Sequence, residues 1–167
     1  AARFSSRVKD VTEFLAANEI VPPTVPVKRV VTYQEPCHLA HAQRITAQPR
    51  TLLKSVPGLE LVEMKESSLC CGSAGIYNII RRQMADDLGD RKAQNILATN
   101  AVDVITANPG CAMQLRSSLA RNGSEARVRH IVEVLDEAYG GPKAQRAIRL
   151  KPVAKRRETT SAATVNA

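Results

Sequence analysis

Short apolar runs alternate along this chain with longer segments of helical spacing, and this alternation constrains the fold more than any other feature. The runs are rich in Val and Ile and cover residues 29–33, 59–64, 102–106 and 128–131, the last being either a fourth strand or the approach to a helix. Runs that are apolar on both faces are typical of parallel strands covered by helices on each side. The sequence therefore predicts an α/β, Rossmann-like three-layer domain with a short, mostly parallel sheet of about four strands.

Proline and helical spacing divide the chain into parts. The apolar spacing behind Ser5 and Ser6 predicts an amphipathic helix with a serine N-cap that ends near Asn18. The prolines that follow, at 22, 23 and 26, forbid regular structure and predict a linker. We therefore expect an N-terminal helix and Pro-rich linker over 1–26, an α/β domain over 27–142 and a tail over 143–167.

The net charge of +8 belongs mostly to the tail. Residues 143–167 hold seven of the 24 Lys and Arg residues but one of the 16 Asp and Glu residues. A nucleic-acid-binding domain would carry its basic residues on the folded surface, so no nucleic-acid partner is expected. The tail is expected to be a solvated, disordered end.

Two further signals limit the class of protein. No apolar run approaches the roughly 20 residues of a membrane span, and the first residues lack the apolar segment of a signal peptide. We therefore expect a cytoplasmic location. No G-x-G-x-x-G sequence follows the first predicted strand, which disfavours a dinucleotide-dependent enzyme.

The chain has four cysteines, and each follows a predicted strand. Cys37 comes after the first strand, Cys70 and Cys71 after the second, and Cys111 after the third. Because the carboxyl ends of parallel strands meet at one edge of a sheet, we expect the four thiols to converge there. Each is also expected where a helix begins, and the free N–H groups of a helix N-terminus favour the thiolate that binds metals.

The residues beside the cysteines suggest supporting roles. The segment 72–75, with Gly72, Ser73 and Gly75, would bring N–H donors close to a negatively charged cluster. His38 is expected to donate to a cysteine sulfur, and His41 is a reserve metal ligand. Two interpretations of Asn108 are equally good: its side chain hydrogen-bonds the backbone of the turn before Cys111, or it is a plain turn residue. His130 is assigned no role.

Several alternatives compete with a metal cluster. A single cysteine is more often a small buried apolar residue. A disulfide framework is disfavoured, because adjacent cysteines do not readily pair and the chain is not small. A thiol–disulfide enzyme that uses Cys70 and Cys71 is weaker still, since the usual redox pair is C-x-x-C. Zinc remains open, with Cys37, His41, Cys71 and Cys111 as four ligands.

Three motifs resemble a known family. They are CHLAHAQ from Cys37, CCGSAGIYN from Cys70, and NPGC ending at Cys111. They resemble the cysteine-rich "CCG" domain, which occurs in heterodisulfide reductase and in iron–sulfur subunits of flavin-linked dehydrogenases. The residue sequences of these motifs are most similar to those in the C-terminal part of the glycolate oxidase iron–sulfur subunit.

The resemblance implies an electron-transfer subunit rather than a fragment that is catalytic alone. It implies an iron–sulfur cluster of the 4Fe–4S type on Cys37, Cys70, Cys71 and Cys111, to which the zinc site described above remains the alternative. It implies as partners a flavin-containing subunit that oxidises glycolate to glyoxylate and a further iron–sulfur segment, with peripheral membrane or quinone contact through the complex. Gln114 stands where heterodisulfide reductase has a further cysteine, which suggests unequal parts for Cys70 and Cys71.

Overall fold

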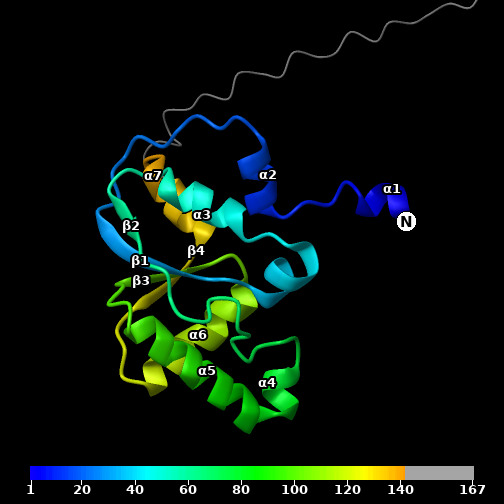
Figure 1. Cartoon of the computed structure of the whole chain (residues 1–167), viewed down its shortest axis with the longest axis vertical. Helices are drawn as coiled ribbons and strands as arrows, with labels where there is room; N and C mark the ends of the chain where they lie inside the picture. Colours follow the sequence, from blue (N-terminus) through cyan, green and yellow to red (C-terminus); the bar gives the residue numbers. More distant parts are fainter. Residues whose placement is uncertain (142–167) are drawn as a thin grey trace, which may run out of the picture.

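The computed structural model describes residues 1–141. Its centre is a four-stranded parallel sheet in the order β2-β1-β3-β4 (Figure 1). The strands are β1 (Arg29–Gln34), β2 (Leu59–Leu61), β3 (Asp103–Thr106) and β4 (Arg127–His130). The predicted three-layer α/β domain is therefore confirmed, and 128–131 contributes a strand. The predicted tail over 143–167 lies outside the described residues.

Helices cover both faces of the sheet (Figure 1). On one face lie α2 (Val11–Ala17), α3 (Ala47–Lys54) and α7 (Ile131–Ala138). On the other lie α5 (Arg82–Leu97) and α6 (Pro109–Arg121), with the short α4 (Tyr77–Ile80) leading into α5. Two further short elements are α1 (Ala2–Ser5) at the N-terminus and η1 (His38–Gln43), a single π-helical turn directly after β1.

The core consists of two apolar clusters, one on each face of the sheet. In β3, all four residues are buried; Val104 packs with α5 and α6, whereas its neighbour Ile105 packs with α3 and α7. Val31 and Tyr33 of β1 belong to the same cluster as Ile105, on the face covered by α3 and α7. Successive strand residues point to opposite faces, so a strand covered on both sides carries apolar residues on both faces, as the adjacent Val104 and Ile105 do in β3. This explains the continuous apolar runs of the sequence.

The order of the strands reverses direction at the middle of the sheet, between β1 and β3. The chain runs from β1 outward to β2, then returns to form β3 on the other side of β1. The carboxyl ends of β1 and β3 are in register, with Gln34 beside Thr106, and the Thr106 hydroxyl donates to Gln34 Oε1 at 2.8 Å. In open parallel sheets, ligands bind outside the carboxyl ends of the strands at such a switch point.

Several boundaries differ from the sequence-based expectation. The N-terminal helix α2 begins at Val11, not behind the serines, because Asp10 is its N-cap and accepts the N–H of Thr12 at 2.8 Å. The second strand ends at Leu61, not at residue 64. The N–H of Val62 still donates to the carbonyl of Val31, and the chain then turns away toward the double cysteine.

Candidate metal centre

The four cysteines lie around one cavity at the carboxyl edge of the sheet, with a volume of about 440 Å³. Three separate stretches of chain contribute to its wall: the one after β1, the one between β2 and α4, and the one after β3. Its lining residues are Cys37, His38, Cys70, Cys71, Ser73, Ala74, Gly75, Asn108, Gly110 and Cys111. The structure thus brings the four cysteines to one edge of the sheet, as the strand positions predicted, and places His38, Ser73 and Gly75 in the same wall.

Cys37 is placed by the π-helical turn that follows β1. It is the N-cap of η1, and the carbonyl of Pro36 accepts the N–H groups of Leu39 and Ala40. The buried Leu39 anchors the turn in the core, and Arg44, in the left-handed conformation at φ 57°, ends it. Isolated π-helical turns are frequent at functional sites. Cys37 therefore sits at a helix start, as expected.

The double-cysteine loop depends on the close approach of Gly72 to α5. Gly72 has a φ of +91°, and a Cβ at this position would lie 2.3 Å from the carbonyl oxygen of Ala85. Gly72 is not among the residues that line the cavity, and its N–H donates to the Cys70 sulfur at 3.4 Å. The expectation that Cys70 and Cys71 stand at a helix start is wrong, because α4 begins only at Tyr77. For these thiols, loop N–H groups replace the helix N-terminus.

Cys111 lies in the first turn of α6. The helix begins at Pro109, and the Asn108 side chain caps it by accepting the N–H of Cys111 at 2.9 Å. Asn108 is thus a capping residue in the wall of the cavity, which decides between its two sequence-based interpretations. A Cβ at Gly110 would lie 3.1 Å from Asn108 Oδ1 and 3.4 Å from Ser73 Oγ. The cap and the double-cysteine loop therefore pack closely against each other.

The thiols are electrostatically unequal. A side-chain hydrogen bond with Cys111 lowers the pKa of Cys71 to about 6, and the backbone N–H of Ser73 acts in the same direction. The same hydrogen bond with Cys71, together with burial, raises the pKa of Cys111. Burial raises the pKa of Cys70. The hydrogen bond between the two thiols therefore favours one shared proton and one thiolate in the Cys71–Cys111 pair.

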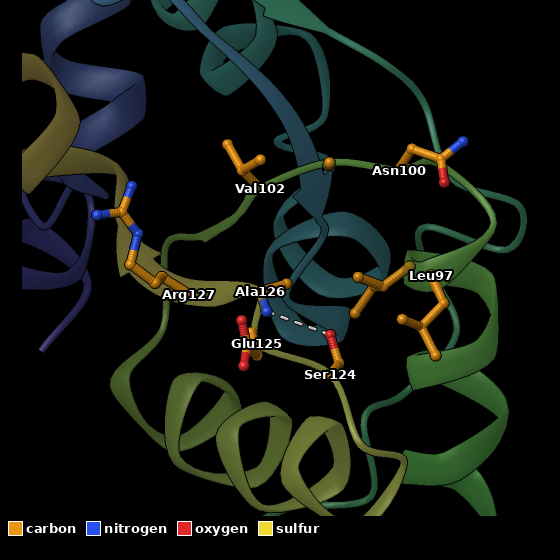
Figure 2. A pocket seen from close by; sticks show the side chains of 9 residues that line it. Leu97, Asn100, Val102, Ser124, Glu125, Ala126 and Arg127 are labelled. Atoms are coloured by element: carbon orange, nitrogen blue, oxygen red, sulfur yellow. Dashed lines mark hydrogen bonds between the residues drawn. The ribbon is translucent and has the colours of Figure 1, made fainter.

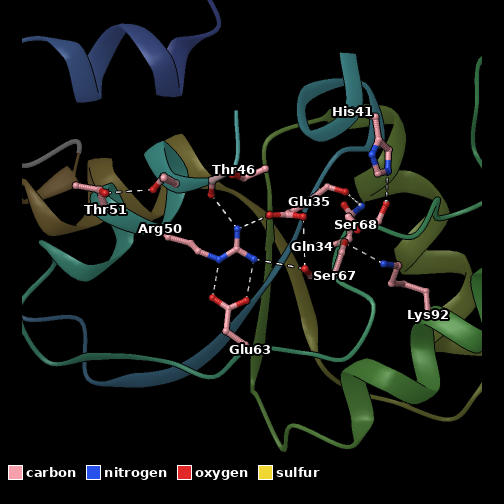
Figure 3. A network of polar contacts seen from close by, with 11 residues as sticks. Gln34, Glu35, His41, Thr46, Arg50, Thr51, Glu63, Ser67, Ser68 and Lys92 are labelled. Atoms are coloured by element: carbon pink, nitrogen blue, oxygen red, sulfur yellow. Dashed lines mark hydrogen bonds and ion pairs between the residues drawn. The ribbon is translucent and has the colours of Figure 1, made fainter. Parts of the chain in front are cut away.

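The two histidines near Cys37 are placed differently. His38 lines the cavity, whereas His41 is exposed, with its Nε2 3.2 Å from the carbonyl oxygen of Ser68 (Figure 3). His41 is not among the residues that line the cavity. Within residues 1–141, no three Cys, His, Asp or Glu side chains are already gathered closely enough to hold a single metal ion.

Gln114 and His130 have structural roles in the fold. The buried Gln114 amide donates to the carbonyl of Ala85 at 3.3 Å and accepts from Asn78 at 3.4 Å, so it joins α6 to α4 and α5. It does not line the cavity. His130 is the N-cap of α7, in a capping box with Glu133.

Sequence reasoning missed Lys92. Its side chain is fully buried, and its Nζ donates to the backbone carbonyls of Glu66 and Ser67, just before the double cysteine. A signal for this existed, because residues 85, 89, 92, 93 and 96 form the buried stripe of α5. A lysine at the helical position of a core residue is rarely buried without a specific partner.

A second cavity, of about 420 Å³, lies at the opposite, amino-terminal edge of the sheet (Figure 2). It is bounded by the end of α5 and the beginnings of β3 and β4. Its lining residues are Ile96, Leu97, Asn100, Ala101, Val102, Ser124, Glu125, Ala126 and Arg127. Its wall carries none of the cysteines or histidines, so the candidate site is the cavity at the carboxyl edge.

Within the described residues, no helix has both the length and the apolar character that crossing a bilayer requires.

Three known proteins are each similar to this chain over about four fifths of its length. The chain is 39% identical over 144 residues to the "Probable glycolate oxidase iron-sulfur subunit" of Bacillus subtilis, which covers 84% of this chain and 32% of that protein. It is 41% identical over 133 residues to a subunit of the fumarate reductase (CoM/CoB) of Methanothermobacter marburgensis, covering 79% and 27%. It is 31% identical over 137 residues to "Lactate utilization protein A" of Shouchella clausii, covering 81% and 57%.

The chain thus spans about a third of the first relative, about a quarter of the second and just over half of the third. Residues 31–116 match the family described as the cysteine-rich domain, CCG. This match begins inside β1 and ends in α6, so it includes all four cysteines and the strands that place them. The chain therefore belongs to the cysteine-rich CCG domain family.

Proposed function

We propose that this chain is an iron–sulfur electron-transfer domain of a multi-subunit oxidoreductase. The observation that carries the proposal is the arrangement of Cys37, Cys70, Cys71 and Cys111 around one cavity at the switch point of a parallel sheet. Relatives named as iron–sulfur proteins support the cofactor class. The domain would occupy residues 27–142.

The residues fit a cluster chemically. Four thiol groups are available as ligands, and the hydrogen bond with Cys111 favours the thiolate form of Cys71. A cluster on cysteine thiolates carries net negative charge, which the N–H groups of the 72–75 loop and the first turn of α6 would stabilise. The cluster, when bound, would supply reversible one-electron transfer. Ser73, Gly75 and His38 would shape the cavity around it, and Gly72 would hold the loop.

We propose a 4Fe–4S cluster rather than zinc. Four cysteine ligands are the set that a 4Fe–4S cluster uses, and within the described residues no three candidate ligands already meet at the single point that a zinc ion needs. The zinc alternative required His41 beside three cysteines, and His41 instead approaches the carbonyl of Ser68. The position of His41, away from the cavity, thus favours the iron–sulfur cluster over zinc.

We further propose that the natural partners are a flavin-containing subunit that oxidises glycolate to glyoxylate and a further iron–sulfur segment. The Bacillus subtilis relative, named as a glycolate oxidase subunit, supports this choice. The names of the other two relatives support a fumarate reductase complex and a lactate-utilisation complex as competing assignments, and a heterodisulfide reductase-like complex is a further alternative. Electrons would pass on toward an acceptor such as a quinone, in a cytoplasmic complex in peripheral contact with the inner face of the membrane.

Anaerobic reconstitution with iron and sulfide tests the cofactor directly. The proposal expects broad absorption in the visible range and an EPR signal after reduction. Protein that instead takes up stoichiometric zinc, without that absorption, would show a zinc-stabilised interaction module. Rapid reoxidation of a reduced flavin subunit of the glycolate type by the reconstituted domain would support the proposed partner. Transfer only from a lactate- or fumarate-type subunit would reassign it.

A further inference from the structure

Lys92 is a buried cation that contacts the backbone leading into the double cysteine of the candidate centre. Its side chain reaches from α5 toward the segment that leads into the double cysteine (Figure 3). Its ammonium donates to the carbonyl oxygens of Glu66 at 2.5 Å and Ser67 at 3.0 Å. The relative exposure of the residue is 0%.

The carboxylate next to Lys92 is engaged elsewhere. Glu66 turns its side chain outward, where its oxygens accept from Arg91 and from Asn95 at 3.0 Å. Lys92 itself forms no ion pair in the part of the chain that the structure describes. A buried ammonium that is bonded only to carbonyl dipoles is costly unless other negative charge lies near. Burial accordingly lowers the pKa of Lys92 to about 8, against the attraction of Cys71 and the smaller attractions of Glu66, Cys70 and Glu35.

The segment that Lys92 holds is fixed from its other side as well. The carbonyl of Ser67 also accepts the N–H of Glu35, and the Ser67 hydroxyl is 3.4 Å from Arg50 Nη2 (Figure 3). Glu66 has a φ of 53°, a left-handed conformation that these contacts stabilise. The backbone before Cys70 is thus clamped between β1 and α5. The ammonium cannot move away from the thiols without breaking this clamp.

From this placement we propose that Lys92 is the fixed counter-charge of the cysteine site. It positions the segment that carries Cys70 and Cys71, and its positive charge offsets the negative charge of the thiolate ligands. This deepens the proposed function and, for its redox part, rests on it. Because reduction adds an electron to a site that is already negative, a nearby fixed cation favours the reduced state and raises the reduction potential.

Substitutions separate the charge of Lys92 from its hydrogen bonds. Lys92→Gln retains an N–H donor for the carbonyls but removes the charge, whereas Lys92→Arg retains the charge. Arg91→Met removes the neighbouring cation, which is exposed and paired with Glu66, and is the matched control. In the reconstituted protein, Lys92→Gln should have a lower midpoint potential than the wild type. Arg91→Met and Lys92→Arg should remain close to it.

A second measurement does not depend on the iron–sulfur cluster. Cobalt(II) binding to the cluster-free chain is followed by the thiolate-to-cobalt charge-transfer absorption. Lys92→Gln should weaken cobalt affinity by about tenfold, the effect of one pKa unit on a single thiolate, while Arg91→Met should leave it unchanged. Far-UV circular dichroism establishes that each variant is folded.

The outcomes separate the two proposals. If folded Lys92→Gln matches the wild type in both cobalt affinity and potential, the counter-charge assignment is wrong. If Lys92→Gln does not fold, Lys92→Arg decides, because a folded arginine variant with a markedly lower cobalt affinity would also overturn the assignment. If the wild type assembles no iron–sulfur cluster, the proposed function fails, while the cobalt measurement still tests Lys92.

Discussion

At the scale of single residues, the geometry of the double cysteine rests on Gly72. Its backbone has a φ of +91° and passes so close to α5 that a methyl group would meet the carbonyl of Ala85. The neighbouring Gly75 also has a positive φ, of +62°, but has open space where a Cβ would be. Alanine variants at the two positions therefore separate the cost of backbone strain, which both would have, from the cost of a steric conflict, which only Gly72→Ala would have.

Gly72→Ala should lower the free energy of unfolding of the cluster-free chain by about 2–5 kcal/mol, because strain and overpacking add. Gly75→Ala should lower it by about 1–2 kcal/mol, from the left-handed backbone alone. Urea unfolding followed by circular dichroism measures both. Equal losses in the two variants would show that the contact with Ala85 does not constrain the loop.

His41 gives a second prediction at this scale, because it separates the two candidate metals. Its imidazole approaches the carbonyl of Ser68 and does not line the cavity. His41→Ala should therefore leave the iron content of the reconstituted protein unchanged. His130→Ala, which removes only the N-cap of α7, is the control for a general effect of losing a histidine. Loss of iron in the His41 variant alone would make His41 a ligand.

At the scale of elements, α6 carries Cys111 at a position that its cap determines. Asn108 accepts the N–H of Cys111, and Pro109 begins the helix. Asn108→Ala should lower the free energy of unfolding by about 1 kcal/mol, and Asn108→Ser should restore most of it, because serine is also a good N-cap. Thermal or urea unfolding tests the pair. A serine variant as unstable as the alanine variant would contradict the capping role.

The contact between α3 and the chain that leaves β2 gives a pH-dependent prediction. Arg50 in α3 bonds both carboxylate oxygens of Glu63, at 2.6 and 2.8 Å (Figure 3). These hydrogen bonds lower the pKa of Glu63 below its ordinary 4.5. A carboxyl whose pKa is lowered by folding contributes stability above its unfolded pKa and loses it as the pH falls through the folded value.

Glu63→Gln should therefore lower the free energy of unfolding at neutral pH by about 0.5–1 kcal/mol, since the pair is partly exposed. The difference from the wild type should shrink as the pH falls below the ordinary carboxyl pKa. Glu60→Gln, which removes an exposed carboxylate of β2 without touching Arg50, is the matched control. A Glu63 effect that is constant with pH would mean that packing, rather than charge, is responsible.

At the scale of the whole molecule, the sheet and the convergence of the cysteines were predictable because both follow from topology. Adjacent apolar residues such as Val104 and Ile105 of β3 indicate a strand covered on both faces, and residues that follow parallel strands must share an edge. Local details were less predictable. Residues 62–64 look like a strand but leave the sheet after Leu61, and Cys70 and Cys71 precede a loop rather than a helix.

The unpredicted parts of the site depend on tertiary contacts between distant segments. His41 could be a ligand by its spacing from Cys37, but the carbonyl of Ser68 lies beside it. Gln114 stands where a related motif has a cysteine, yet it bonds Ala85 in α5. Lys92 is buried because the carbonyls before Cys70 face α5. Pattern and spacing along the chain carry no record of these partners.

Acid-labile sulfide tests the central claim most directly, because only an iron–sulfur cluster contains it. The measurement compares anaerobically reconstituted wild type with Cys111→Ser, which removes one thiol of the cavity. The account predicts iron and labile sulfide bound to the wild type and lost from the Cys111 variant. Wild-type protein without labile sulfide, or equal sulfide in both proteins, would contradict it.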